Sequence, residues 1–114
     1  MKAGQIVLAR IQQADGQNKT RPVLVLCRMP PFSDCLVCAL SSILHHECVG
    51  FDEIIDGTDN DFSGSGLKVP SLIRLGLVAT IPAEAVLGEL GIISEERLIR
   101  LRAKLARHIE SGHW

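Results

Sequence analysis

The sequence predicts a mostly β protein, a small closed or half-open barrel with one amphipathic helix at its C-terminal end. Three observations indicate this fold class: the apolar runs are short and separated by turn signals, helical periodicity is confined to the last segment, and no helix lies between the predicted strands. A doubly wound α/β sheet is excluded because it needs such crossover helices, whereas closing a sheet removes its exposed edges. With 114 residues, the chain is expected to form one domain over residues 1–114.

The first predicted strands are residues 5–10 and 22–27, and the second is apolar throughout, which is typical of a central strand buried on both faces. Between them, Gln12 to Thr20 is polar, contains the turn pair Asp15-Gly16 and is expected to be a flexible loop. Pro30-Pro31 breaks the chain before the later strands. These are expected at 35–40, within 47–55, at 71–75 and at 77–81, with Gly76 between the last two.

The segment 56–66 is acidic and rich in Gly and Ser, with little apolar surface to bury. We therefore expect a mobile surface loop. Its pattern Asp56-x-x-Asp59-x-Asp61 lacks the spacing of a calcium-binding loop, so the carboxylates are expected to be solvated.

The C-terminal element is predicted to be an amphipathic helix over residues 95–110. Ser94 is a good N-cap, and Glu95 and Glu96 complement the helix dipole in the first turn. Leucine and isoleucine recur at helical spacing, at Leu98, Leu101, Leu105 and Ile109. The basic residues of the helix are expected on a solvated face: Arg97, Arg100, Arg102, Lys104 and Arg107.

The formal net charge of −1 gives no bulk attraction to nucleic acid, so any RNA binding requires a local basic groove. Neither a membrane-spanning stretch nor a secretory signal is found in the sequence, and the protein is expected in the cytoplasm. Its four cysteines are therefore expected to be reduced thiols.

Cys35-x-x-Cys38 invites a zinc interpretation, with other candidate ligands at Cys27, Cys48, His45 and His46. However, no second Cys-x-x-Cys pair exists, and residues three apart in a strand point to opposite faces. Buried thiols are the favoured interpretation, and neither a metal nor a cofactor is expected.

An ordered set of short motifs runs along nearly the whole chain. It comprises Gly4-Gln5-Ile6-Val7, Lys19-Thr20-Arg21-Pro22-Val23-Leu24-Val25, Cys38-Ala39-Leu40-Ser41-Ser42, Gly66-Leu67-Lys68-Val69-Pro70-Ser71, Ile73-Arg74-Leu75, Thr80-Ile81 and Leu87-Gly88-Glu89-Leu90. The set resembles the MazF/PemK toxins of bacterial type II toxin–antitoxin systems. The resemblance implies an SH3-like barrel of the CcdB/MazF/PemK type, a homodimer, and metal-independent, sequence-specific cleavage of single-stranded RNA. It also implies an acidic antitoxin that lies across the active groove.

The same resemblance assigns the candidate site. Arg21 matches the family's catalytic arginine, Ser41 its catalytic threonine, and Arg74 a second arginine of the PemK-like branch. A guanidinium offers a planar fork of donors that suits a phosphate, and Pro22 restricts Arg21 to an extended conformation. Five nearby residues are expected to contact RNA: Lys19, Thr20, Ser42, His45 and His46.

Two expected groups are missing. The PemK-like branch has an aspartate where this chain has Gly76, and a loop histidine that Gln12 to Thr20 lacks. His45 or His46 could supply a group that titrates near pH 7.

The missing carboxylate supports an alternative function, a binding module of the same fold that binds an antitoxin, RNA or DNA gyrase. In simpler interpretations, Ser41 only forms a turn and Arg74 pairs with the acidic loop.

Overall fold

One antiparallel sheet of six strands, in the order β4-β5-β3-β2-β1-β6, forms the body of the molecule. The computed structural model describes residues 1–12 and 14–114. Its strands are β1 (Gln5–Gln12), β2 (Asn18–Met29), β3 (Asp34–Ser41), β4 (Glu53–Ile55), β5 (Ser71–Ile81) and β6 (Val86–Ile92). Its helices are α1 (Phe62–Ser65), α2 (Glu95–Glu110) and two 3₁₀ turns, Leu44–His46 and Ala83–Ala85. The prediction of a mostly β fold with one C-terminal helix is confirmed.

The central strand β2 is buried on both faces, as its apolar run predicts. Leu24 and Leu26 belong to a core that also contains Leu98 and Leu101 of α2. Val23 and Val25 belong to a second core on the other face, together with Val7 of β1 and Val37 of β3. Because side chains alternate along a strand, the continuous apolar run of β2 supplies both cores at once.

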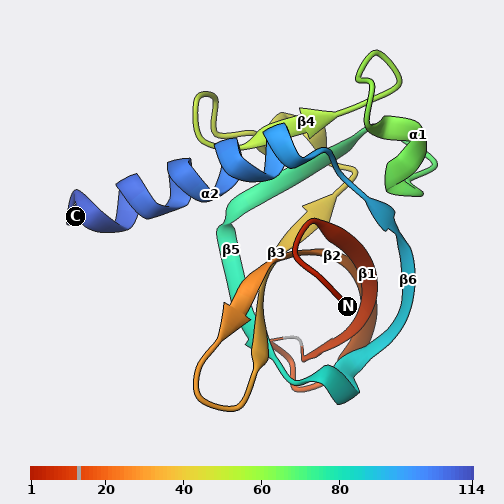
Figure 1. The fold of residues 1–114 in the computed structure, drawn as a ribbon, viewed down its shortest axis with the longest axis vertical. Coiled ribbons are helices and arrows are strands. Elements are labelled where there is room, and N and C mark those ends of the chain that lie inside the picture. Colours follow the sequence, from red (N-terminus) through yellow and green to blue (C-terminus); the bar gives the residue numbers. More distant parts are fainter. Residues whose placement is uncertain (13) are drawn as a thin grey trace.

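The sheet curls strongly (Figure 1), but it is not closed into a barrel, because no described residue pairs β4 with β6. The curl is accompanied by register irregularities in several ladders, including one where Cys38 pairs with Val78 while Ala39 pairs with Arg74. The extra residues lie around Gly76. The two short strands expected on either side of Gly76 are therefore one bent strand, β5, because such an irregularity bends a strand without ending it.

The outer edge of β6 is approached closely by α1. Gly91 lies so near the backbone of Gly64 and Ser65 that a Cβ atom there would be 2.3 Å from the Gly64 carbonyl oxygen. Gly66, which follows α1 with φ of 75°, would place a Cβ 2.1 Å from the Leu90 carbonyl oxygen. Glycine at positions 66 and 91 is what lets this segment cover the edge strand.

Helix α2 begins and ends where the sequence predicts. The Ser94 hydroxyl accepts a hydrogen bond from the Arg97 backbone N–H at 3.2 Å, which is the expected N-cap contact. Leu98 and Leu101 are buried beneath the helix, while its C-terminal end extends past the sheet (Figure 1). No helix in the described part of the chain is long and apolar enough to span a membrane.

The acidic segment differs from its prediction. Asp61 is buried and accepts hydrogen bonds from Arg97 Nε at 2.8 Å and from the Ser94 backbone N–H at 3.1 Å. Glu53 pairs with Arg97, Arg100 and Lys104. The expected mobile, solvated loop was wrong for Asp61, and the expected solvated basic face was wrong for Arg97, because the two opposite charge runs meet in the fold.

The connection between β1 and β2 is shorter than expected, and the one that precedes β4 is longer. β1 extends to Gln12 and β2 begins at Asn18, so both ends of the expected flexible loop are strand and residues 14–17 form the connection between them; residue 13 lies outside the described residues. In contrast, the expected strand within 47–55 is reduced to Glu53–Ile55, because Cys48 and Asp52 form a turn held by the Asp52 carboxylate.

Candidate functional site

A groove of about 900 Å³ opens where β2, β3 and β5 meet the turns that follow β3 and precede β5. Arg21, Ser41 and Arg74 all line it. Arg21 is exposed, whereas Ser41 and Arg74 are half-buried. The three residues that the resemblance places in the catalytic site are therefore found around one open cavity.

The strand register explains this convergence. Val23 of β2 pairs with Ala39 of β3, and Ala39 pairs with Arg74 of β5, so these three residues form one row across the sheet. Arg21 precedes Val23 by two residues and Ser41 follows Ala39 by two. Because β2 and β3 are antiparallel, both steps lead past the last paired residues, Val23 and Ala39, toward the same end of the sheet.

Period-two alternation also places these side chains on one face. Arg21 shares its face with Val23 and Val25, whose side chains belong to the core inside the curl of the sheet. The two arginines and the serine thus lie on the same face of the sheet as this core, at its groove end.

The Ser41 hydroxyl already has one role. It accepts a hydrogen bond from the backbone N–H of Ile43 at 3.0 Å, which is the turn-forming role that the simpler interpretation predicts. A hydroxyl also has a proton to donate, so this contact leaves Ser41 able to hydrogen-bond an oxygen atom in the groove.

The charge of the groove is one-sided. Arg21, Lys68 and Arg74 line it, and none of its described lining residues is Asp or Glu. Arg74 makes no ion pair with a described residue of the acidic segment, whose carboxylates Asp59 and Asp61 pair with Arg97 of α2, as Glu53 of β4 also does. The expectation that Arg74 pairs with the acidic loop is therefore wrong.

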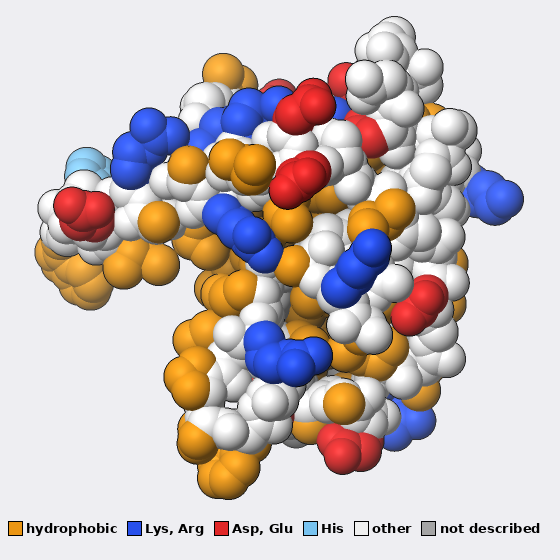
Figure 2. Space-filling model, viewed as in Figure 1, with side chains coloured by type: hydrophobic (Ala, Val, Ile, Leu, Met, Phe, Trp, Pro, Cys, Tyr) orange, Lys and Arg blue, Asp and Glu red, His pale blue; other side chains and the backbone are white. Residues whose placement is uncertain are grey.

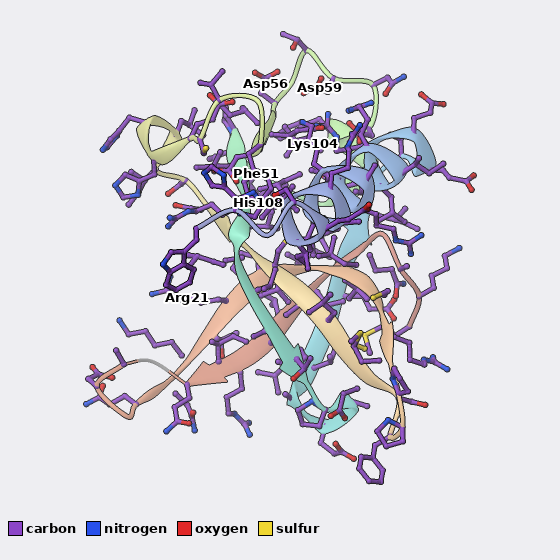
Figure 3. The ribbon with its side chains drawn as sticks, turned by 90° about the vertical axis from the view of Figure 1, so that its left-hand side faces the viewer. Arg21, Phe51, Asp56, Asp59, Lys104 and His108 are labelled. Atoms are coloured by element: carbon purple, nitrogen blue, oxygen red, sulfur yellow. The ribbon has the colours of Figure 1, made fainter. Side chains whose placement is uncertain are left out.

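The view in Figure 3 makes this separation visible. Asp56 and Asp59 lie above α2, close to the end of the molecule, whereas Arg21 lies below the helix. Lys104 lies on the helix, where its Nζ contacts Glu53 at 3.0 Å. The helix cations thus neutralise carboxylates at a distance from the groove.

Much of the rest of the groove wall is aliphatic. It includes the exposed side chains of Ile43, Val69, Leu77 and Val78, and its described residues include no Phe, Tyr or Trp. Sequence reasoning did not predict this wall or Lys68. The motif Gly66-Leu67-Lys68-Val69-Pro70-Ser71 was part of the resemblance, but no chemical role pointed to its lysine.

The five residues expected to contact RNA are divided by the structure. Ser42 and His46 line the groove, whereas Lys19, Thr20 and His45 do not. The His45 ring packs edge-on against His46 with centroids 4.7 Å apart, so it lies next to the groove lining. Of the two candidate titrating groups, His46 is the one at the cavity.

The two cysteines of the Cys-x-x-Cys pair lie on opposite faces of β3. Cys35 belongs to the core inside the curl and Cys38 to the core beneath α2. Burial, with a smaller effect of the Asp52 charge, raises the pKa of the Cys38 thiol to about 12. Cys38 is thus held as a neutral thiol that packs as a small apolar side chain.

Together, the curled antiparallel sheet, the C-terminal helix and the cationic groove define a small, mostly β protein with one open basic groove among its described residues. The family model described as PemK-like, MazF-like toxin of type II toxin-antitoxin system matches residues 2–109, and the chain belongs to this family. Among solved structures, it resembles the Mycobacterium tuberculosis toxin MazF-mt6 with a TM-score of 0.68 and 19% sequence identity, over 93% of this chain and 96% of that chain. At this identity the likeness shows the fold. No curated protein matches the sequence.

Proposed function

We propose that this toxin is a metal-independent endoribonuclease that cleaves single-stranded RNA at the groove. One observation carries the proposal: Arg21, Ser41 and Arg74 converge on a single cavity whose described lining has cations and no carboxylate. A local basic groove is what RNA binding requires in a protein of net charge −1.

The reaction is a transesterification, in which phosphorus exchanges its bond to the 5′-oxygen for a bond to the neighbouring 2′-oxygen. The 2′-hydroxyl loses its proton and attacks phosphorus, the bond from phosphorus to the 5′-oxygen breaks, and that oxygen gains a proton. The products are a 2′,3′-cyclic phosphate and a 5′-hydroxyl. Negative charge accumulates on the phosphoryl oxygens in the transition state, so donors that are already in place lower the barrier.

Each candidate residue has a role that its chemistry allows. Arg21 donates two hydrogen bonds from its planar fork to the phosphoryl oxygens, and Arg74 adds a second positive charge from the next row of the sheet. Ser41 donates its hydroxyl proton to one of the same oxygens. His46 lines the groove, and its imidazole is the proposed group for proton exchange with the reacting oxygens.

The acting form is proposed to be a homodimer whose activity is blocked by an acidic antitoxin. Leu77 and Val78 are 48% and 45% exposed, and hydrophobic side chains gather along the β5 side and under the overhanging end of α2 (Figure 2). Surface of this kind is expected where another chain packs. Sedimentation should give twice the chain mass of 12.4 kDa, and a monomer at micromolar concentration would contradict the dimer.

The central test is cleavage of a long transcript in excess EDTA. Wild-type protein is expected to cut it and leave 2′,3′-cyclic phosphate ends, and Arg21→Ala should reduce the rate by about 10²-fold or more, because a donor to the developing charge is lost. Arg10→Ala is the matched control, since Arg10 is exposed on β1 and does not line the groove. Equal rates for Arg21→Ala and wild type would defeat the assignment.

A second candidate function is a binding module that inhibits without cleaving. It is favoured by Gly76, which stands two residues after Arg74 and supplies no carboxylate there. Tight antitoxin binding, or inhibition of gyrase supercoiling, by a protein that leaves RNA intact would establish it.

A further inference from the structure

Lys68 is the cation of the groove for which the sequence suggested no role. It is exposed, it lines the cavity with Arg21 and Arg74, and it makes no ion pair with any residue that the structure describes. In contrast, Arg97, Arg100 and Lys104 are all paired with carboxylates. These three cations of α2 are therefore paired within the protein, whereas Lys68 lines the groove without a described carboxylate partner.

The turn that carries Lys68 is held at its beginning. The Leu67 backbone N–H donates to the Ser65 hydroxyl at 3.1 Å, and that hydroxyl donates to the Phe62 carbonyl. Ser65 is fully buried, and Gly66 packs directly on the Leu90 backbone. The chain entering the turn has little freedom to move.

The turn is held at its end as well. Ser71 is buried, pairs with Ile55 of β4, and donates its hydroxyl to the Val69 carbonyl at 3.0 Å. Pro70 fixes one backbone angle between them. Lys68 thus projects from a short segment whose two ends are anchored in the fold, which limits the entropy lost when its ammonium binds a ligand.

We propose that Lys68 binds a phosphate of the RNA strand beside the one held by Arg21. The inference rests on the proposed ribonuclease function and deepens it, because it assigns a backbone contact outside the reacting phosphate. A lysine ammonium serves as a point charge for phosphate and does not need the fork geometry of an arginine. Contact with a non-reacting phosphate strengthens substrate and transition state alike, so it changes KM more than kcat.

The test measures how binding depends on salt. The ligand is a transcript fragment that wild type cleaves, made resistant by a 2′-deoxy substitution at the mapped cut. Each phosphate contact to a single strand contributes about 0.7 to the slope of log K against log salt, so Lys68→Ala should make this slope shallower by about 0.7. On the cleavable fragment, its KM should rise several-fold while kcat stays within about twofold of wild type.

Two variants serve as controls. Lys68→Arg keeps the charge and should keep the wild-type slope. Lys2→Ala removes an exposed lysine just before β1, at the opposite end of that strand from the groove residues Ile11 and Gln12, and should also leave the slope unchanged. The unfolding midpoint of Lys68→Ala should match wild type, because the side chain is exposed.

The failures are distinguishable. If wild type cleaves and binds RNA but Lys68→Ala keeps its slope and KM, the inference about Lys68 is overturned and the ribonuclease assignment stands. A large loss of kcat at unchanged slope would also overturn it, since Lys68 would then act at the reacting phosphate. If wild type neither cleaves nor binds RNA, both proposals are wrong.

Discussion

At the scale of single residues, Gly76 is where the proposed ribonuclease site differs from the PemK-like branch, which has an aspartate at this position. In a regular strand, a residue two positions after Arg74 shares its face, although the ladder is irregular at this point. A Cβ atom at position 76 would meet no heavy atom within 4 Å, and its backbone does not need glycine for a positive φ. Position 76 therefore has space for a carboxylate side chain, and the packing of the fold does not require glycine there.

Gly76→Asp is expected to accelerate RNA cleavage. A carboxylate beside Arg74 could take up the 2′-hydroxyl proton, and a positioned general base typically contributes 10²-fold or more, so the rate should rise by about 10²-fold. Initial rates on the same transcript, measured between pH 5 and 8, check this.

Gly76→Asn is the matched control for this gain, since it has the same shape without the charge, and it should leave the rate near that of wild type. Equal rates for the Asp and Asn variants, with both proteins folded, would show that position 76 is not a place from which a base can act.

The family resemblance assigned Arg21, Ser41 and Arg74 through short motifs in or beside apolar strands, whose order along the chain can be read from the sequence. It did not predict Lys68, whose approach to the groove depends on Gly66 packing against Leu90 and on the bend of β5. Contacts between segments that are distant in the chain leave no periodic signal in a single sequence. For the same reason Lys19, Thr20 and His45 were expected at a groove that they do not line.

At the scale of elements, α2 is joined to the acidic segment by Arg97. This side chain is 6% exposed and contacts Glu53 at 2.9 Å, Asp59 at 3.3 Å and Asp61 at 2.8 Å. Helix periodicity predicted α2 correctly, but it could not reveal that one arginine of the helix is buried, because its partners lie in a segment that reads as a loop. The contact fixes the chain between β4 and β5, which continues into the groove wall.

Arg97→Ala is expected to destabilise the protein by about 3–5 kcal/mol, since it leaves buried carboxylates without their partner. Arg100→Ala is the matched control: Arg100 also pairs with Glu53, but its side chain is 53% exposed, so its loss should cost no more than about 1 kcal/mol. Urea unfolding followed by circular dichroism measures both. Equal losses for the two variants would mean that burial does not set the strength of these contacts.

At the scale of the whole molecule, opposite charges are sorted into two regions. Carboxylates of residues 53–61 meet the cations of α2 at one end, and the described lining of the groove includes cations but no Asp or Glu. A net charge near zero therefore conceals a polar arrangement, which composition alone could not predict. The mostly β fold class, the central position of β2 and the C-terminal helix were predicted from the sequence, and the open edge between β4 and β6 agrees with the half-open form of the predicted barrel.

The sorting makes stability depend on pH. Burial of the Glu53 carboxylate opposes its ionisation, but hydrogen bonds and charges from Arg100 and Lys104 outweigh burial and lower its pKa below the ordinary 4.5. The pKa of Asp61 is likewise lowered below 3.8, because contacts with Arg97 and Ser94 outweigh its burial. A group whose pKa is lower in the folded state stabilises the fold above its unfolded pKa, and this contribution is lost as pH falls through the folded pKa.

The free energy of unfolding is therefore expected to be steady from pH 7 to about 5 with respect to these two groups, and to fall below about pH 4. Glu53→Gln should be less stable than wild type by about 2 kcal/mol at pH 7, since charged hydrogen bonds are lost, and this difference should shrink as the pH approaches 2. Glu89→Gln, which removes an exposed carboxylate on β6, should differ little from wild type throughout. Urea unfolding at each pH gives the differences. A Glu53→Gln penalty as large at pH 2 as at pH 7 would show that the carboxylate stabilises the fold through packing and not through its charge.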